Sequence, residues 1–156
     1  MSNYEERLEN DIAEIRSEIR RIGLSVEEAL SNALQAASDY DKPLAYKTIL
    51  ADKRVNRAIS KLDRHCHYFV ARHLPSAGHL RFISSTLRMS IEIERVGDYA
   101  TTICREVAQL SEPLPSNLSR EVEQMGRKAK RMLHQALGAF DESNTELAQA
   151  LILGNA

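Results

Sequence analysis

Two carboxylates stand four residues apart in the segment from Ile91 to Ala100, at Glu94 and Asp98. In a helix, side chains at this spacing share one face and lie about one turn apart. Their oxygen atoms could together bind a hard or borderline metal ion, or they could form an acidic patch in water. Because solvated acidic faces are common, the spacing alone favours the patch. A metal site would need further ligands beside this pair.

The elements that position these carboxylates are expected to be helices. Apolar residues recur with helical periodicity along the chain, and no window shows the sustained alternation of a strand. We predict an all-α protein with five helices, over about residues 3–38, 42–73, 76–111 and 117–140 and from 143 onward. The boundaries rest on capping boxes and prolines, namely Ser2 with Glu5, Asp41 with Pro43, Pro113 with Pro115, and Ser143 with Glu146. The short connections favour an antiparallel bundle.

An internal repeat divides the chain. When the sequence is slid along itself by 103 residues, Gly23 meets Gly126 and eight apolar positions also match without a gap. The first members of these pairs are Leu30, Ala33, Leu34, Ala36, Leu44, Ala45, Ile49 and Leu50. We therefore predict a complete three-helix repeat over residues 1–112 and a truncated, two-helix second repeat over 116–156. Without a third helix to cover them, apolar residues of the second repeat are expected to be exposed and to favour a homodimer; they are Met125, Met132, Leu133, Leu137, Leu147, Leu151 and Ile152.

Helix geometry brings other oxygen ligands to the level of Glu94 and Asp98. With turns near Asp41 and Leu74, position 96 lies opposite position 52, and position 54 lies opposite position 28. The residues with carboxylate or amide groups at this level are Glu27, Glu28, Asp52, Asn56, Glu94 and Asp98. Around the third helix, Glu94 and Asp98 lie nearly opposite the apolar stripe of Ile93, Val96, Ala100, Ile103, Val107 and Leu110. We therefore expect both carboxylates to be accessible to solvent.

Five of these residues are the predicted metal ligands: Glu94, Asp98, Asp52, Asn56 and Glu28. A bound cation would relieve the repulsion between gathered carboxylates. Because the group contains no Cys and no His, it suits Mg, Mn, Ca or Fe ions better than structural zinc. Helical neighbours such as His65, Cys66 and His67 point about 100° apart and are not expected to converge on one ion.

Several function classes are disfavoured by what the sequence contains. The 21 basic and 22 acidic residues nearly cancel, which gives no electrostatic case for nucleic acid or an anionic membrane. The acidic start and the short apolar runs predict a cytoplasmic chain with no membrane insertion. Phosphate-binding loops and nucleophile motifs are absent. A basic cluster at Arg127, Lys128, Lys130 and Arg131 fits either a solvated face or a docking patch for an acidic partner.

Several segments resemble the PhoU family of phosphate-signalling regulators. The most specific are His73 to Arg81 (HLPSAGHLR) and Glu94 to Ala100 (ERVGDYA), with further similarity at residues 21–30 and 52–56. The resemblance implies two three-helix repeats, each with a Glu/Asp-x-x-x-Asp motif that lines a surface site for iron- or zinc-type clusters. The chain departs from this pattern because it has no second motif and because Asn56 stands where an acidic residue is expected.

The resemblance implies a regulatory adaptor rather than an enzyme. Such an adaptor restrains phosphate uptake and phosphate-starvation signalling through contacts with the ATPase subunit of a phosphate ABC transporter and with a sensor histidine kinase. A bound Fe, Zn, Mn or Mg ion is possible at the predicted ligands. Two alternatives stay open: a di-metal helical-bundle hydrolase with Glu94 and Asp98 as ligands, and a helical scaffold in which this pair has no role. The lack of His at that level argues against the hydrolase.

Overall fold

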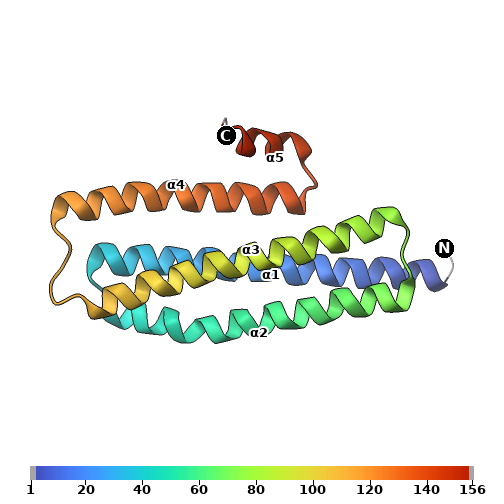
Figure 1. Ribbon diagram of the computed structural model, residues 1–156, viewed down its shortest axis with the longest axis horizontal. Coiled ribbons are helices and arrows are strands. Elements are labelled where there is room, and N and C mark those ends of the chain that lie inside the picture. Colours follow the sequence, from blue (N-terminus) through green and yellow to red (C-terminus); the bar gives the residue numbers. More distant parts are fainter. Residues whose placement is uncertain (1–2, 155–156) are drawn as a thin grey trace.

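The computed structural model describes residues 3–154, which form five helices and no strand (Figure 1). The helices are α1 (Asn3–Asp39), α2 (Lys42–His73), α3 (Ala77–Gln109), α4 (Ser116–Asp141) and α5 (Thr145–Ile152). The all-α prediction is confirmed, and the expected boundaries of the first four helices agree within two residues. Ser2, half of the first predicted capping box, lies outside the described residues. No described helix is long and apolar enough to span a membrane.

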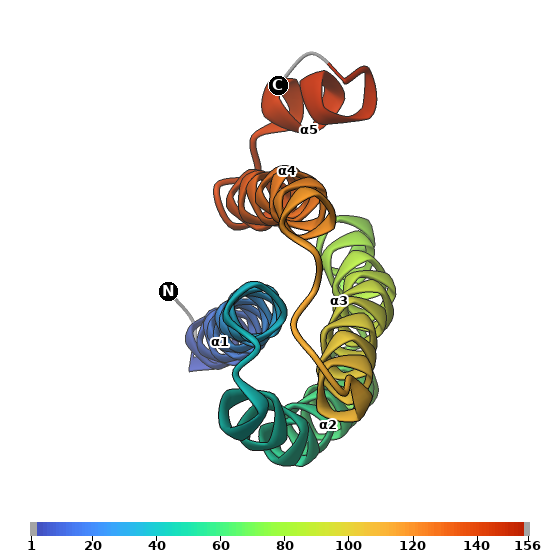
Figure 2. The same cartoon turned by 90° about the vertical axis from the view of Figure 1, so that its left-hand side faces the viewer.

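The first three helices run antiparallel in succession and pack side by side (Figures 1 and 2), and their buried apolar residues form two clusters. On α1, buried apolar residues recur every three or four positions, which places them on one face. They are Leu8, Ile12, Ile15, Ile19, Ile22, Val26, Leu30, Ala33 and the adjacent pair Ala36 and Ala37. From the other two helices, Leu62, Phe69 and Ile83 are almost fully buried in one cluster with the residues from Leu8 to Val26, and Ala45, Ala100 and Cys104 form the second cluster with those from Leu30 onward.

The connections between these helices are fixed by polar contacts. The Asp41 side chain accepts a hydrogen bond from the Leu44 amide at 2.9 Å and so caps α2, as the sequence predicts. The Tyr40 hydroxyl and the Lys42 ammonium group donate to the Leu110 carbonyl at 2.9 and 2.6 Å. The first turn is thereby tied to the end of α3, at one end of the bundle.

The start of α5 differs from the prediction by one residue. Its N-cap is Asn144, whose side chain accepts from the Leu147 amide at 2.9 Å. Ser143 instead has a φ of 53° and belongs to the turn after α4. The capping box of Ser143 and Glu146 was therefore wrong, because a residue with positive φ ends one helix here and its neighbour starts the next.

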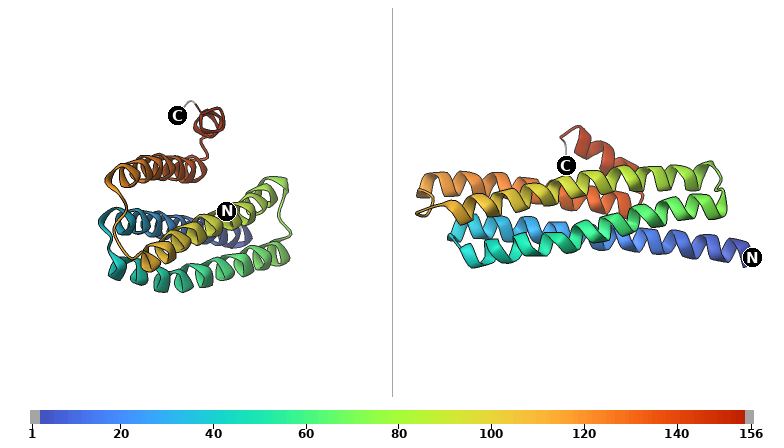
Figure 3. Two further views of the ribbon diagram at one scale, coloured as in Figure 1. Left: turned by 60° about the vertical axis from the view of Figure 1, so that its left-hand side comes forward. Right: turned by 60° about the horizontal axis from the view of Figure 1, so that its bottom comes forward.

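The fourth helix lies along α1 and antiparallel to it, and α5 contacts α4 on the outer side (Figures 2 and 3). Two glycines lie where α1 and α4 pack tightly against each other. A Cβ atom at Gly23 would lie 2.7 Å from Leu137 Cδ2, and one at Gly126 would collide with Leu34. Gly23 and Leu34 are equivalent to Gly126 and Leu137, respectively, in the 103-residue repeat. The glycine of each repeat therefore contacts the leucine of the other.

The last two helices are less buried than the first three. In α4 only Gly126 and Ala139 are fully buried, and no residue of α5 is. Met125, Met132 and Ile152 are 64%, 59% and 84% exposed. Leu133 and Leu137 were expected to be uncovered, but they are partly buried against the core of the first repeat. That part of the prediction was wrong, because α4 packs back on α1.

Candidate functional site

The predicted carboxylate pair flanks Gly97, a buried residue at which α3 contacts both α1 and α2. Gly97, between Glu94 and Asp98, is buried, and a Cβ atom there would lie 3.6 Å from Val26 Cγ2 and 4.0 Å from Asp52 Oδ1. Asp98 is exposed and Glu94 is partly buried. Asp52 of α2 therefore lies beside α3, as its predicted position along the bundle requires, and α1 reaches the same place through Val26.

The buried face of α3 is rotated from the predicted stripe. Ile93, Gly97 and Cys104 lie near its centre and Thr101 lies at one edge, whereas Val96 and Ile103 are only partly buried. Small side chains allow helices to pack closely. A prediction of the buried face that uses only large apolar residues does not include them. Glu94, seven residues before Thr101, therefore lies near the edge of the buried face and not opposite it. This explains its partial burial.

Asp52 and Glu28 line a cavity of about 560 Å³ between α1 and α2, which Gly97 and Thr101 of α3 also line. One Asp52 oxygen accepts a hydrogen bond from Asn56 Nδ2 at 2.9 Å. The charged residues around this cavity are Glu18, Glu28 and Asp52 against Arg21, Lys47, Arg54 and Lys61. The basic side chains were missed by the sequence argument, and they give the cavity a mixed charge rather than an acidic one.

The five predicted ligands share a level but do not meet at one point. Within residues 4–154, no three of the four carboxylates Glu28, Asp52, Glu94 and Asp98 bring oxygen atoms within 4.8 Å of one another. Glu27, a sixth residue of this level, faces the other way, and its Oε1 lies 2.9 Å from Nδ1 of His134 on α4. A metal ion at these residues would therefore require the side chains to move together or water molecules to complete its coordination.

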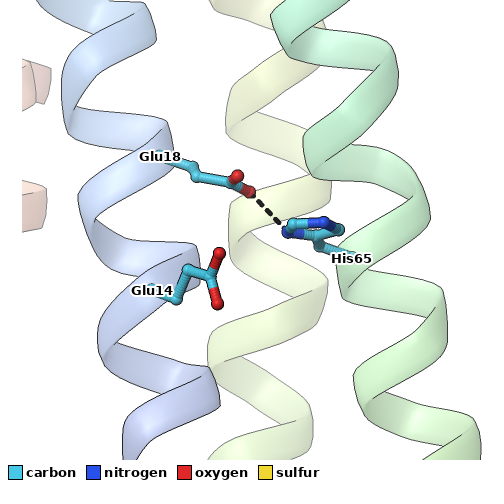
Figure 4. Close-up of side chains that lie close together, drawn as sticks. All are labelled: Glu14, Glu18 and His65. Atoms are coloured by element: carbon cyan, nitrogen blue, oxygen red, sulfur yellow. Dashed lines mark ion pairs between the residues drawn. The ribbon is translucent and has the colours of Figure 1, made fainter.

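A tighter group of possible ligands lies elsewhere, at Glu14, Glu18 and His65. One ligand atom from each of these residues lies within 4.8 Å of the others (Figure 4). Sequence reasoning missed this group, although a signal was present. Glu14 and Glu18 have the same four-residue spacing as Glu94 and Asp98, and a turn near Asp41 places position 65 opposite position 17.

The two cysteines are buried, and the two histidines beside Cys66 contact different partners. Cys66 is fully buried in the core, and burial, with smaller effects of Asp63 and Glu18, raises the pKa of its thiol to about 12. Burial also raises the pKa of the Cys104 thiol, partly offset by Thr48. His65 points toward α1, whereas His67 contacts Asp63 of its own helix. The two histidines thus diverge, as their two-residue spacing on a helix predicts.

Comparison with known proteins decides the family. A PhoU domain matches residues 19–107, which is more than half of the chain and includes Glu94 and Asp98. The chain belongs to the PhoU family. The phosphate-specific transport system accessory protein PhoU of Escherichia coli K12 is 33% identical over 130 residues, which are 83% of this chain and 54% of that protein. The homologue from Pseudomonas aeruginosa is 32% identical over 88% of this chain and 57% of its own length.

The fold agrees with this family assignment. The crystal structure of PhoU from Pseudomonas aeruginosa superposes with a TM-score of 0.86 at 30% sequence identity, over 91% of this chain and 68% of that one. The resemblance to PhoU that the sequence motifs predict is therefore confirmed. The chain spans about half the length of the curated PhoU relatives it matches.

Proposed function

We propose that this chain acts as a regulatory adaptor in phosphate uptake and phosphate-starvation signalling, as a cytoplasmic protein without catalytic activity. The observation that carries the proposal is the PhoU domain over residues 19–107, together with relatives that are named accessory proteins of phosphate-specific transport. The long exposed helix faces are suited to protein contacts, and an adaptor needs only different affinities for two states of its partners.

The proposed partners are the ATPase subunit of a phosphate ABC transporter and a sensor histidine kinase. The basic cluster on α4 supports a contact with an acidic surface, since Arg127, Lys128, Lys130 and Arg131 are all exposed. Purified chain should capture either partner in a pull-down, and replacing the three residues Lys128, Lys130 and Arg131 with Glu should weaken capture at low salt. Equal capture by this variant would show that the contact lies on another face.

We further propose that Glu94, Asp98, Asp52, Asn56 and Glu28 bind one or more metal ions, of which Fe, Zn, Mn and Mg are candidates. The approach of Asp52 to Gly97, between the α3 carboxylates, supports the proposal. Elemental analysis of chain purified without chelators, compared with a Glu94→Gln, Asp98→Asn double variant, tests it. Equal metal content in both would place the ion elsewhere.

We propose a homodimer formed through α4 and α5, whose exposed Met125, Met132 and Ile152 provide apolar surface. Sedimentation over a range of concentrations should show a monomer–dimer equilibrium, and Met125→Glu with Met132→Glu should shift it to monomer. A chain that stays monomeric at high micromolar concentration would refute the dimer without affecting the adaptor proposal.

A further inference from the structure

Glu18 is a buried carboxylate between α1 and α2, and one of its oxygens lacks a hydrogen bond. The residue is 5% exposed. Its Oε1 accepts a hydrogen bond from the Lys61 ammonium group at 2.7 Å. Its Oε2 has no hydrogen bond and forms only an ion pair with Nδ1 of His65, 2.9 Å away. Buried carboxylate oxygens are normally hydrogen-bonded, and a cation bound between this oxygen and the His65 nitrogen would supply the missing interaction.

Two further ligand atoms converge on that oxygen. Glu14 lies one turn before Glu18 on α1, and His65 projects from α2 toward both carboxylates (Figure 4). The three ligand atoms lie within 4.8 Å of one another. We propose that Glu14, Glu18 and His65 bind one divalent transition-metal ion, for which Zn²⁺ is the best match.

The ligand set favours zinc over magnesium or calcium. Two carboxylates and one imidazole make three protein ligands, which leaves a fourth position of a tetrahedral ion for water. An imidazole nitrogen suits Zn²⁺ and its neighbours in the first transition row, whereas Mg²⁺ and Ca²⁺ take oxygen ligands. This distinguishes the site from the all-oxygen group around Glu94 and Asp98.

The side chains have to move closer together to hold the ion. Zinc bonds to oxygen and nitrogen are about 2.1 Å long, so two ligand atoms of a tetrahedral ion lie roughly 3.4 Å apart. Ligand atoms that lie up to 4.8 Å apart therefore have to approach by up to about 1.4 Å. Glu14 is exposed and its side chain is long, so it can move this far. His65, with its side chain 33% exposed, leaves the site open to solvent.

Lys61 explains how the site can fold without metal. Its ammonium group balances the charge of Glu18 through Oε1 and leaves Oε2 facing Glu14 and His65. The site also lies apart from the other candidate ligands, since Glu28 is ten residues further along α1, or about 15 Å. A bound ion would link α1 to α2 and stiffen this hairpin, independently of whether the adaptor proposal holds.

The test is calorimetric titration of the metal-free chain with Zn²⁺. It is carried out in the Glu94→Gln, Asp98→Asn background, so that the other proposed site does not contribute. We expect one Zn²⁺ per chain at this site, and at least tenfold weaker binding after His65→Gln and after Glu14→Gln. His67→Gln is the matched control, because His67 is an exposed histidine two residues away that contacts Asp63. Circular dichroism establishes that each variant keeps its helical content.

A spectroscopic readout separates direct coordination from an indirect effect. Addition of Zn²⁺ should shift the ring nitrogen signals of His65 in an NMR spectrum and leave those of His67 in place. Co²⁺, as a coloured substitute, should give visible absorption that His65→Gln removes. The proposal is overturned if the chain binds no Zn²⁺, if His65→Gln and Glu14→Gln bind it as tightly as the parent, or if the His65 signals do not move.

Discussion

Replacing Gly126 with alanine should weaken the packing of α4 on α1. The added Cβ would collide with the side chain of Leu34, which lies against this glycine. Gly138 is the matched control, because it lies in the same helix and a Cβ there meets nothing within 4 Å. The two substitutions make the same chemical change and differ only in what surrounds them.

The magnitudes of the two changes can be compared directly. Alanine in place of glycine within a helix stabilises it by up to about 1 kcal/mol, and Gly138→Ala should gain part of this. Gly126→Ala receives the same gain but must displace Leu34, and overpacking typically costs about 1–3 kcal/mol. We therefore expect Gly126→Ala to be about 1–3 kcal/mol less stable than Gly138→Ala.

Urea unfolding followed by circular dichroism measures this difference. In a thermal scan it should appear as a melting temperature lower by roughly 2–4 °C for each kcal/mol. Shortening the opposing side chain in the double variant Gly126→Ala, Leu34→Ala should relieve the collision, so the two changes should couple favourably. If Gly126→Ala were as stable as Gly138→Ala, the reciprocal packing of the two repeats would be refuted.

Three further predictions follow from the same structure. Asp41→Ala should cost about 1 kcal/mol in unfolding free energy, because it removes the cap on the Leu44 amide, whereas Asp41→Asn should retain most of it. Cys66 should react with a thiol reagent at neutral pH only after unfolding. Burial raises the pKa of the folded Cys66 thiol from 9.0 to about 12, so its contribution to the unfolding free energy should be complete below pH 9 and decline as the pH rises toward 12. Cys66→Ala should reduce this decline when unfolding is measured at several pH values. Replacing Glu94 and Asp98 with Ala should change stability by no more than about 1 kcal/mol, since both lie at or near the surface, while lowering the metal content measured by elemental analysis.

The helices and the repeat could be predicted from sequence because their signals are local and periodic. Apolar residues at three- and four-residue spacing define α1, and Asp41 and Pro43 start α2. Matching Gly23 with Gly126 and Leu34 with Leu137 identified residues that meet across the α1–α4 contact. Comparing the sequence with itself shows that these residues are equivalent, but it does not predict that they touch. Helix packing depends on the shapes of two segments that are far apart in the chain.

The candidate sites were harder to predict because they depend on helix rotation. A level argument placed Asp52 near α3 correctly, but it could not tell that Glu27 faces His134 or that Asp52 pairs with Asn56. Predicting the cluster of Glu14, Glu18 and His65 requires both the position of His65 along the bundle and the rotation of α2 about its own axis. Rotation is set by the full core, including small residues such as Gly97, which hydrophobic patterns do not register.

The central proposal, that this chain is a phosphate-regulating adaptor, is tested most directly in cells. Expression of the chain in bacteria that lack their own PhoU, followed by measurement of phosphate uptake and of a phosphate-starvation reporter, isolates this function. A variant with Asp98→Lys and Glu94→Lys, expressed in the same amount, tests whether the carboxylates of α3 contribute to this function. The proposal predicts that the chain lowers both uptake and reporter activity in phosphate-rich medium and that the variant does so less. Unchanged uptake and reporter activity, with folded chain present in the cells, would contradict it.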